Sequence, residues 1–451
     1  MARFRVVISA KDYEAMADLV RKYKVTVARH SVRQLRRGYR LYAHASGAQI
    51  RALEAAGYKV KRHEDVDKGG RQRQAEVRAA ATAAGAITAA PSSRYRTVPE
   101  IEAALAAATA APRAAFTQLI RLPHPTWEQR VCHAIKVAAP SAEHGVGIYF
   151  LGGVHAREWG SPDILMNFVE QLIAAYATHA GLTIGAKTFT AAQIQTIVNT
   201  KQIFVFPQAN PDGRLYSMTK DSMWRKNRRP APAKKAKCAG VDINRNYDFL
   251  WNYVVHFDPS APIANSVDPC NETYIGPSSF SEPETKNAAW MFDQFHSIRY
   301  FIDVHSYSEA ILYNWGDDTD QTTDPAMNFQ NPAFDGKRGL ANDTAYKEYV
   351  AAADKTAMVQ LANRMRDAIQ AVRGRTYTVE QSVGLYPTAG TSDDYAFSRY
   401  IVDKTKAKVY SYAIEWGRPS NPTPFHPAFP EMGKIIQEVT AGLLEFCVRA
   451  A

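Results

Sequence analysis

Apolar and polar residues alternate along the first 66 residues in a pattern that predicts six short elements. They are, in order, a strand at 3–10, a helix at 12–24, strands at 25–30 and 40–44, a helix at 47–56 and a strand at 58–62. The order β-α-β-β-α-β is that of the split βαβ, ferredoxin-like unit, which packs without help from further chain. The pattern therefore predicts a small α+β domain at residues 1–66.

The pattern changes after this domain. Residues 68–93 are mostly Gly, Ala, Arg and Gln, with almost no bulky apolar side chain for a core, and they predict a linker at 67–94 that is helical at its start. Further along, short apolar runs such as 146–151 and 202–206 alternate with long amphipathic segments such as 354–372. This alternation predicts a layered α/β domain at residues 95–451.

Composition adds one asymmetry. The net charge is +11, and the whole excess lies in residues 1–80, which hold 19 Lys or Arg against 8 Asp or Glu. Such a domain could face nucleic acid, an anionic surface or an acidic part of the same chain, or it could carry a solvated basic face. Neither aromatic interleaving nor a nucleic-acid motif accompanies the charge, so we expect no nucleic-acid partner. No apolar run approaches the ~18 residues of a membrane helix, so we expect no membrane span.

Two apolar runs end at residue types that bind metals. His155 and Glu158 follow the strand predicted at 147–152, and His305 ends the apolar run that begins at Phe301. Catalytic zinc takes three such protein ligands and keeps a fourth position for water, and open α/β sheets place their sites at the carboxyl ends of strands. An HxxE spacing alone is a weak signal, and a lone histidine is more often a hydrogen-bonded core residue.

Six ordered motifs strengthen this interpretation. They are His155 to Trp159 (HAREW), Trp224 to Lys226 (WRK), Val241 to Asn246 (VDINRN), Asp303 to Ser308 (DVHSYS), Tyr386 with Ala389 to Tyr395 (AGTSDDY), and Ser411 to Glu415 (SYAIE). Over residues 95–447 the sequence resembles the carboxypeptidase A and B family of zinc peptidases. The resemblance implies a mixed, mostly parallel twisted sheet flanked by helices.

The resemblance also implies roles for the motif residues. One Zn²⁺ would be held by His155, Glu158 and His305. Glu415 would be the general base and Arg225 would polarise the scissile carbonyl. Further residues would contact the substrate: Asn244 and Arg245 at its terminal carboxylate, Tyr386 as a mobile cover, and Arg157 and Tyr307 at secondary positions.

Side-chain preference depends on Asp393, which aligns with the residue near the floor of the family's specificity pocket. A carboxylate there favours C-terminal Lys or Arg. Gln381 matches neither branch of the family, so broad specificity for basic and apolar termini stays open. The insertion at 317–347 carries an acidic stretch at 317–320, for which a solvated loop is favoured over a Ca²⁺ site because no regular ligand spacing follows.

The resemblance further implies a disulfide between Cys238 and Cys270, whereas Cys132 and Cys447 are expected to be buried thiols. Such a disulfide favours a secreted, extracellular protein, although the first ten residues show no signal-peptide core. Secreted members of the family are often zymogens whose N-terminal domain has the order found here, so we expect a zymogen cut by a protease within residues 68–78. We expect a monomer acting on peptide or protein C-termini.

Three competing functions remain. A pseudoenzyme that only binds C-termini is disfavoured because no catalytic position is substituted. An anionic-surface binder rests only on the basic N-terminal residues. A peptidase for acidic termini conflicts with Asp393, which would repel them.

Overall fold

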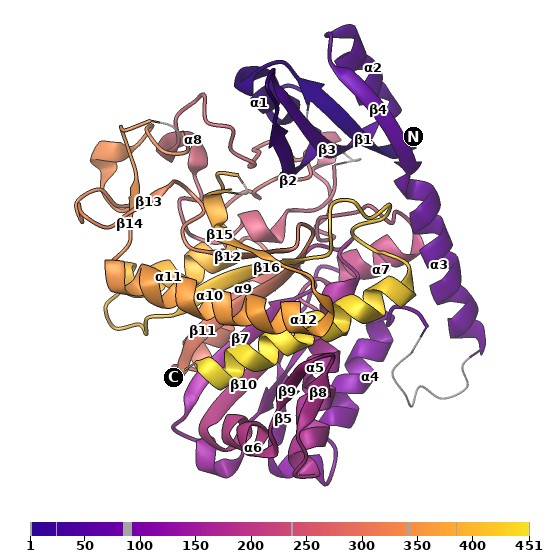
Figure 1. Ribbon diagram of the computed structural model, residues 1–451, viewed down its shortest axis with the longest axis vertical. Helices are drawn as coiled ribbons and strands as arrows, with labels where there is room; N and C mark the ends of the chain where they lie inside the picture. Colours follow the sequence, from indigo (N-terminus) through magenta and orange to yellow (C-terminus); the bar gives the residue numbers. More distant parts are fainter. Residues whose placement is uncertain are drawn as a thin grey trace.

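The computed structural model describes residues 2–23, 25–83, 93–235, 238–340, 343–384 and 386–450. Two layered units share one molecule (Figure 1). The N-terminal unit, in indigo, lies above the larger unit, and the helix that follows it runs down the side of the larger unit.

The N-terminal unit confirms the expected order. Its elements are β1 Arg3–Ala10, α1 Tyr13–Arg21, β2 Thr26–Gln34, β3 Tyr39–Ser46, α2 Gly47–Ala55 and β4 Lys59–Asp65. The strands form one sheet in the order β2-β3-β1-β4, with β3 and β4 antiparallel to β1 and β2 antiparallel to β3. Alternate residues of β1, Val6 and Ile8, are fully buried with Leu19 of α1 and Ile50 of α2, which gives this unit its own core.

The start of the predicted linker is helical, as expected, and this helix docks on the larger unit, which was not predicted. Helix α3, Val66–Ala83, continues directly from β4 and buries one face on the larger unit. Val77 joins the main core, and the Gln74 amide donates to the carbonyl of Ser217 at 2.8 Å. The two glycines of α3 permit this close approach, because Gly69 and Gly70 lie against Thr423 and Ser222. Residues 84–92 of the predicted linker lie outside the described residues.

The larger unit contains an eight-stranded sheet in the order β15-β12-β16-β11-β7-β10-β6-β5. The strands are β5 Thr117–Arg121, β6 His133–Val137, β7 Val146–Gly152, β10 Lys201–Phe206, β11 Ile298–Ser306, β12 Ala310–Tyr313, β15 Thr378–Gln381 and β16 Tyr410–Trp416. The four central strands are parallel to one another, and antiparallel pairs occur further out. The mixed, mostly parallel sheet is therefore confirmed, and its central strands are apolar because both faces are covered.

Helices cover this sheet on both faces. They are α4 Val98–Ala108, α5 Gly160–Ala177, α6 Ala191–Thr200, α7 Pro211–Thr219, α8 Tyr253–His256, α9 Pro283–Gln294, α10 Ala352–Arg373, α11 Ser392–Val402 and α12 Phe429–Arg449. Figure 1 shows α10 and α12 crossing one face side by side. Two small ribbons complete the unit: β8 Leu182–Ile184 with β9 Lys187–Phe189, and β13 Asp320–Gln321 with β14 Glu348–Tyr349.

The insertion at 317–347 differs from the solvated loop expected from its acidic residues. Asp317 and Asp318 are buried, as is Glu348 of β14. Arg338 lies among them and donates to Asp335 at 2.9 Å. Burial and the neighbouring Glu348 and Asp318 hold the pKa of Asp317 well above its usual range. Within the described residues, no group of three metal-binding side chains converges here, so the Ca²⁺ alternative gains no support.

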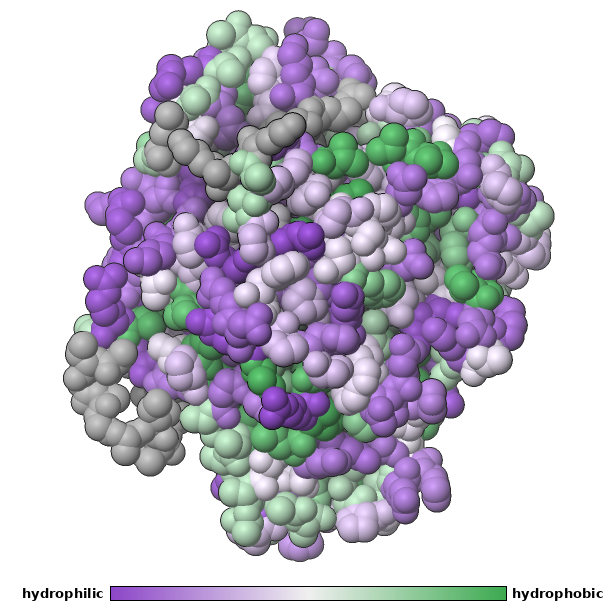
Figure 2. Space-filling model, turned by 180° about the vertical axis from the view of Figure 1, so that it is seen from behind, coloured by the Kyte–Doolittle hydropathy of each residue, from purple (hydrophilic) through white to green (hydrophobic). Residues whose placement is uncertain are grey.

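The molecular surface is mainly hydrophilic on the face in Figure 2, and its apolar side chains there form separate patches. The exposed large apolar residues in the described chain include Val254, Val255 and Val267. None of the helices described by the structure has the length and apolarity needed to span a membrane.

Candidate metal centre and substrate cleft

Two adjacent parallel strands bring the predicted metal ligands together. The chain leaves β7 through Gly153, whose φ of 65° suits glycine, and reaches His155 and Glu158 before α5 begins. His305 is the next-to-last residue of β11, the strand beside β7. His155 Nδ1 lies 2.8 Å from Glu158 Oε1 and 3.1 Å from His305 Nδ1, and His305 Nδ1 lies 3.1 Å from Glu158 Oε2.

These three side chains fit a zinc ion. They offer two imidazole nitrogens and one carboxylate, the set found at catalytic zinc sites, and their ligand atoms all lie within 4.8 Å of one another. A tetrahedral ion with bonds of about 2.0–2.2 Å holds its ligands about 3.3 Å apart, close to the separations here. All three side chains are buried. These ligand atoms point their lone pairs toward the same space, where the lone pairs repel one another. A cation bound between them would remove this repulsion, so the arrangement favours a bound cation.

Asp242 links the metal ligands to the predicted oxyanion arginine. Its Oδ1 lies 3.1 Å from His155 Nε2 and accepts from the backbone N–H of Asn244 at 3.0 Å, while its Oδ2 accepts from Arg225 Nε at 2.9 Å. Burial opposes ionisation, but the charges of Arg225 and His155 hold the pKa of Asp242 well below its usual range. One buried carboxylate thus orients a metal ligand and an arginine on the same side of the cleft.

Glu415 lies beside the metal ligands. It is next to last in β16, which pairs with β11 so that His305 and Glu415 are directly opposite. Burial and the neighbouring Glu158 carboxylate raise the pKa of Glu415 to about 8. The carboxylate is therefore placed within the site and made more basic than a solvated glutamate.

Asn244 and Arg245 occupy a short 3₁₀ turn capped by Asp242. Arg245 donates through Nε to the carbonyl of Ala264 at 2.9 Å and through Nη1 to the carbonyl of Asn244 at 2.5 Å, which fixes the guanidinium plane. The Tyr386 ring lies 5.8 Å from the Arg245 guanidinium carbon. Backbone carbonyls thus accept from Nε and Nη1 of the guanidinium. Among the described residues no hydrogen-bond acceptor is assigned to Nη2, which can bind a ligand in the cleft.

Asp393, which the alignment predicts near the floor of a specificity pocket, lines the cleft, and so does Ser382, to which the sequence interpretation gave no role. Ser382 Oγ donates to Asp393 Oδ2 at 3.1 Å, and both residues line the cleft. Gln381 turns away from the pocket and donates to the carbonyls of Trp315 and Asp318 at 3.0 and 2.7 Å. The mismatch at Gln381 therefore concerns the packing of the insertion, and the adjacent Ser382 shapes the pocket.

The N-terminal unit closes one side of the cleft. Val27 of β2 lines it, and Tyr307 Oη is hydrogen-bonded to His44 Nδ1 of β3 at 3.2 Å. Arg157 lies 4.2 Å from the centre of the Phe425 ring and donates to Glu272 Oε2 at 3.1 Å. Both residues predicted as secondary substrate contacts are thus at the cleft, and one of them is engaged by the N-terminal unit.

All eleven predicted ligand, catalytic and substrate residues line a single open cleft. They are His155, Arg157, Glu158, Arg225, Asn244, Arg245, His305, Tyr307, Tyr386, Asp393 and Glu415. The sequence interpretation gave no role to Asp242 or Asp303, although both stand in quoted motifs, two residues before Asn244 and His305. The sequence did offer a signal for both, namely an aspartate two residues before a predicted metal ligand or substrate contact.

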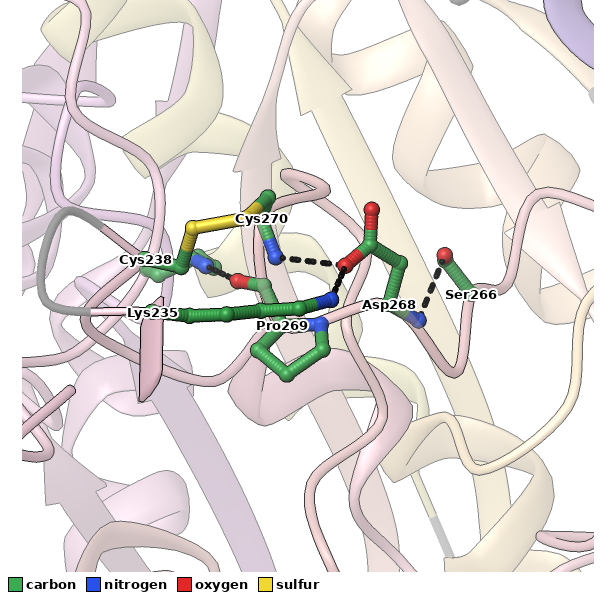
Figure 3. Close-up of a disulfide and its surroundings, with 7 residues drawn as sticks. Lys235, Cys238, Ser266, Asp268, Pro269 and Cys270 are labelled. Atoms are coloured by element: carbon green, nitrogen blue, oxygen red, sulfur yellow. Dashed lines mark hydrogen bonds and ion pairs between the residues drawn. A yellow bond between two sulfur atoms is a disulfide. The ribbon is translucent and has the colours of Figure 1, made fainter. Parts of the chain in front are cut away.

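Cys238 and Cys270 form the expected disulfide (Figure 3). The bond joins the segment before Asp242 to the segment before Glu272, and Asp268 supports it by accepting from the backbone N–H of Cys270 and from Lys235. Cys132 and Cys447 are free and buried, as predicted. The disulfide therefore ties together two loops that border the cleft.

A His-Glu-His cluster beside a partly buried glutamate, at the carboxyl edge of an α/β sheet, defines the class of single-metal hydrolases. The sequence profile described as zinc carboxypeptidase matches residues 103–442. The chain belongs to the zinc carboxypeptidase family and is a metallocarboxypeptidase of the A/B type, which confirms the resemblance.

Individual relatives agree. The chain is 29% identical to carboxypeptidase B of Astacus astacus over 292 residues, which cover 64% of this chain and 76% of that protein. It is 28% identical to carboxypeptidase B of Homo sapiens over 278 residues, 61% of this chain and 54% of that protein. The matched region thus spans about half the length of this mammalian relative.

Solved structures extend the fold similarity to the whole chain. Thrombin-activatable fibrinolysis inhibitor aligns with a TM-score of 0.71 at 20% identity, covering 100% of both chains. Carboxypeptidase A from Helicoverpa armigera aligns with a TM-score of 0.73 at 18% identity, covering 100% of this chain and 98% of that one. The N-terminal unit is included in both alignments.

Proposed function

We propose that this protein removes single amino acids from the C-termini of peptides and proteins, with one Zn²⁺ held by His155, Glu158 and His305. The observation that carries the proposal is the convergence of all eleven predicted residues on one cleft. When bound, the zinc ion would supply a Lewis acid that polarises the scissile carbonyl and makes water more acidic. The other steps belong to the side chains around it.

Arg245 and Asn244 would bind the terminal carboxylate of the substrate. A planar guanidinium pairs with a carboxylate through parallel hydrogen bonds, and the backbone contacts of Arg245 already fix its plane. An internal peptide bond offers no such carboxylate to a buried guanidinium. This explains attack at the chain end rather than within the chain.

Glu415 would accept a proton from the attacking water and pass a proton to the leaving amine. Arg225, oriented by Asp242, would stabilise the negative charge that develops on the carbonyl oxygen. Tyr386, beside Arg245, would cover the bound terminus and exclude water. Each group has one task, and each lies on the same cleft.

Asp393 would favour C-terminal Lys and Arg. The carboxylate is buried, so a cationic side chain entering the pocket would pair with it away from bulk water. Leu312 and Ala413 also line the cleft and give the pocket apolar walls. Those walls support a second possibility, a broader enzyme that also takes apolar termini.

The N-terminal unit would keep the enzyme latent as a zymogen domain. Val27 and His44 contact the cleft, and Arg3 pairs with both Asp67 and Asp221, which joins the two units. An activating protease would have to cut the connection between the units. Residues 68–78 lie within α3, so cleavage there requires this helix to unwind first. The disulfide supports a secreted protein. We also propose a monomer, which the separate apolar patches support on the one face that Figure 2 shows.

One assay tests these proposals. The intact and protease-cut protein would be incubated with blocked dipeptides ending in Arg, Lys, Phe or Glu, with zinc and with a chelator. We expect chelator-sensitive release, greatest for Arg and Lys and greater after cutting. Release that ignores the chelator, or no release with zinc supplied, would exclude the peptidase and leave a peptide-binding pseudoenzyme. Equal activity before and after cutting would exclude the latent form.

A further inference from the structure

Asp303 lies behind one of the metal ligands. It stands two residues before His305 on β11, so the two side chains project from the same face of the strand. Asp303 Oδ2 is 2.9 Å from His305 Nε2, the ring nitrogen that faces away from His155 and Glu158. A metal-binding histidine commonly donates its other N–H to a carboxylate in this way.

The environment of Asp303 is unusual for a charged group. Its side chain is 0% exposed, and its Oδ2 also accepts from Ser392 Oγ, at the start of α11, at 2.6 Å. Its Oδ1 has no hydrogen-bond partner. Among the described residues, its one ion-pair partner is His305, with no Lys or Arg nearby. Burial of such a carboxylate is unfavourable unless positive charge is supplied from another source.

Asp242 provides the comparison within the same site. It stands behind His155 as Asp303 stands behind His305, but its second oxygen is paired with Arg225. The charge of Asp242 is thus balanced by the protein alone. Within the described residues, the charge of Asp303 is paired only with His305, and a cation bound on the opposite side of that ring would add to this balance.

We propose that Asp303 is a positioning residue that increases the affinity of this chain for zinc. It accepts the Nε2–H of neutral His305, which turns the Nδ1 lone pair toward Glu158 and His155, and it adds negative charge behind the ligand. Ser392 holds the carboxylate in this orientation. The free energy needed to bury Asp303 is offset when the cation binds. The inference rests on the proposed zinc site and adds a residue to which no role had been given.

The test measures zinc affinity and metal-free stability separately, on the full-length chain. Zinc dissociation constants would be obtained by competition with a fluorescent chelator, and thermal midpoints would be measured in excess chelator. Asp303→Asn keeps the shape and removes the charge. We expect it to weaken zinc binding by about 10- to 100-fold, while the metal-free midpoint stays the same or rises. Ser392→Ala should weaken zinc binding less, in the same direction.

Asp354→Asn is the matched control. Asp354, at the start of α10, is also a buried aspartate. It is paired with Lys408 and Tyr410 and does not line the cleft. Its substitution should lower the thermal midpoint and leave zinc affinity unchanged. If Asp303 only supports the fold, Asp303→Asn should likewise lower the metal-free thermal midpoint and leave zinc affinity unchanged. That result would overturn the inference. Unchanged zinc affinity in both Asp303→Asn and Ser392→Ala would overturn it as well.

The peptidase assay keeps the two proposals apart. A wild-type chain that binds zinc tightly but releases no amino acid contradicts the proposed function alone, and the zinc affinities of the variants still decide the role of Asp303. Full peptidase activity with equal zinc affinity in wild type and Asp303→Asn contradicts the role of Asp303 alone.

Discussion

The hydroxyl of Tyr307, at the cleft, is hydrogen-bonded to Nδ1 of His44, in the N-terminal unit, across 3.2 Å. The His44 ring is also 5.5 Å from the ring of Phe425, and it is buried between the two units. A neutral imidazole suits this buried contact, whereas a protonated imidazole, although it could donate to the hydroxyl, would place a buried charge close to Arg157 and Arg5. The contact between the units therefore depends on the charge of one histidine.

Acidification should release the N-terminal unit. Burial, with the charges of Arg157 and Arg5, lowers the pKa of docked His44 to about 3. A histidine with a lowered pKa stabilises docking fully above its ordinary value of about 6.5, and this stabilisation is lost as the pH falls below it. Between pH 7 and pH 5 the docking equilibrium should weaken by about 30-fold. Hydrogen exchange of β3, corrected for its intrinsic pH dependence, would report the release.

Several charged groups surround His44, so the prediction needs a matched pair of variants. Cationic neighbours are Arg3, Arg5, Arg157 and His426, and the acids that pair with these arginines are Asp67, Asp221, Glu64 and Glu272. His44→Phe keeps an aromatic ring and should abolish the added exchange at pH 5. His63→Gln, on the exposed part of β4, should retain it. A pH response that persists in His44→Phe would assign the effect to another group.

Glu415→Gln should reduce kcat by about 10²- to 10⁴-fold, because a general base contributes in that range. The amide has the same shape but cannot accept the proton. Zinc content, measured by atomic absorption, should stay at one ion per chain, and KM should change little. A variant that retains kcat within tenfold would show that another group acts as the base.

Asp393→Asn should change specificity rather than activity as a whole. Removing one partner of a buried charge pair costs about 2–5 kcal/mol, so kcat/KM for substrates ending in Arg or Lys should fall by about 30-fold or more. A substrate ending in Phe needs no carboxylate in the pocket and serves as the internal control. Equal losses for all three substrates would mean that Asp393 supports the fold of the cleft and does not select the side chain.

The fold and the metal ligands were predictable because they depend on local patterns. The alternation in residues 3–10 gave β1, and the apolar run before His155 gave the strand end that positions it. Other features depend on partners far along the chain. The approach of Gly69 and Gly70 to Thr423 and Ser222 docks α3, and nothing near α3 in the sequence indicates it.

The pocket shows a second reason why sequence falls short. Successive side chains near a strand end point in opposite directions. An alignment that is wrong by one position therefore assigns to the cleft a residue whose side chain points away from it. Here Ser382 contacts Asp393, and Gln381 holds the insertion. Alignment by position led to Gln381, and only the hydrogen bonds distinguish the two.

The buried acids of the insertion predict a loss of stability at alkaline pH. Burial raises the pKa of Glu348 to about 7. A carboxyl group with a raised pKa stabilises the fold fully below its ordinary pKa of about 4.5, and that contribution is lost as the pH rises through about 7. The contribution of Glu348 to the free energy of unfolding should fall by about 2–3 kcal/mol between pH 5 and pH 9. Glu348→Gln should flatten the curve, measured by denaturant unfolding, and Glu54→Gln on exposed α2 should not.

The disulfide predicts a stability that depends on redox conditions. Cys238 and Cys270 are 32 residues apart, and closing a loop of this size stabilises a fold by about 3–4 kcal/mol in the chain-entropy model. Replacing both with Ser should lower the free energy of unfolding by that amount and should loosen the loops that carry Asp242 and Glu272, which would reduce kcat/KM. A reducing agent should reproduce the loss in the wild type and have no effect on the double variant. Replacing buried Cys132 with Ser should leave the response to the reducing agent intact. An unchanged unfolding midpoint in the reduced wild type would show that the surrounding contacts, such as that of Lys226 with the carbonyl of Pro269, hold the loops without the bond.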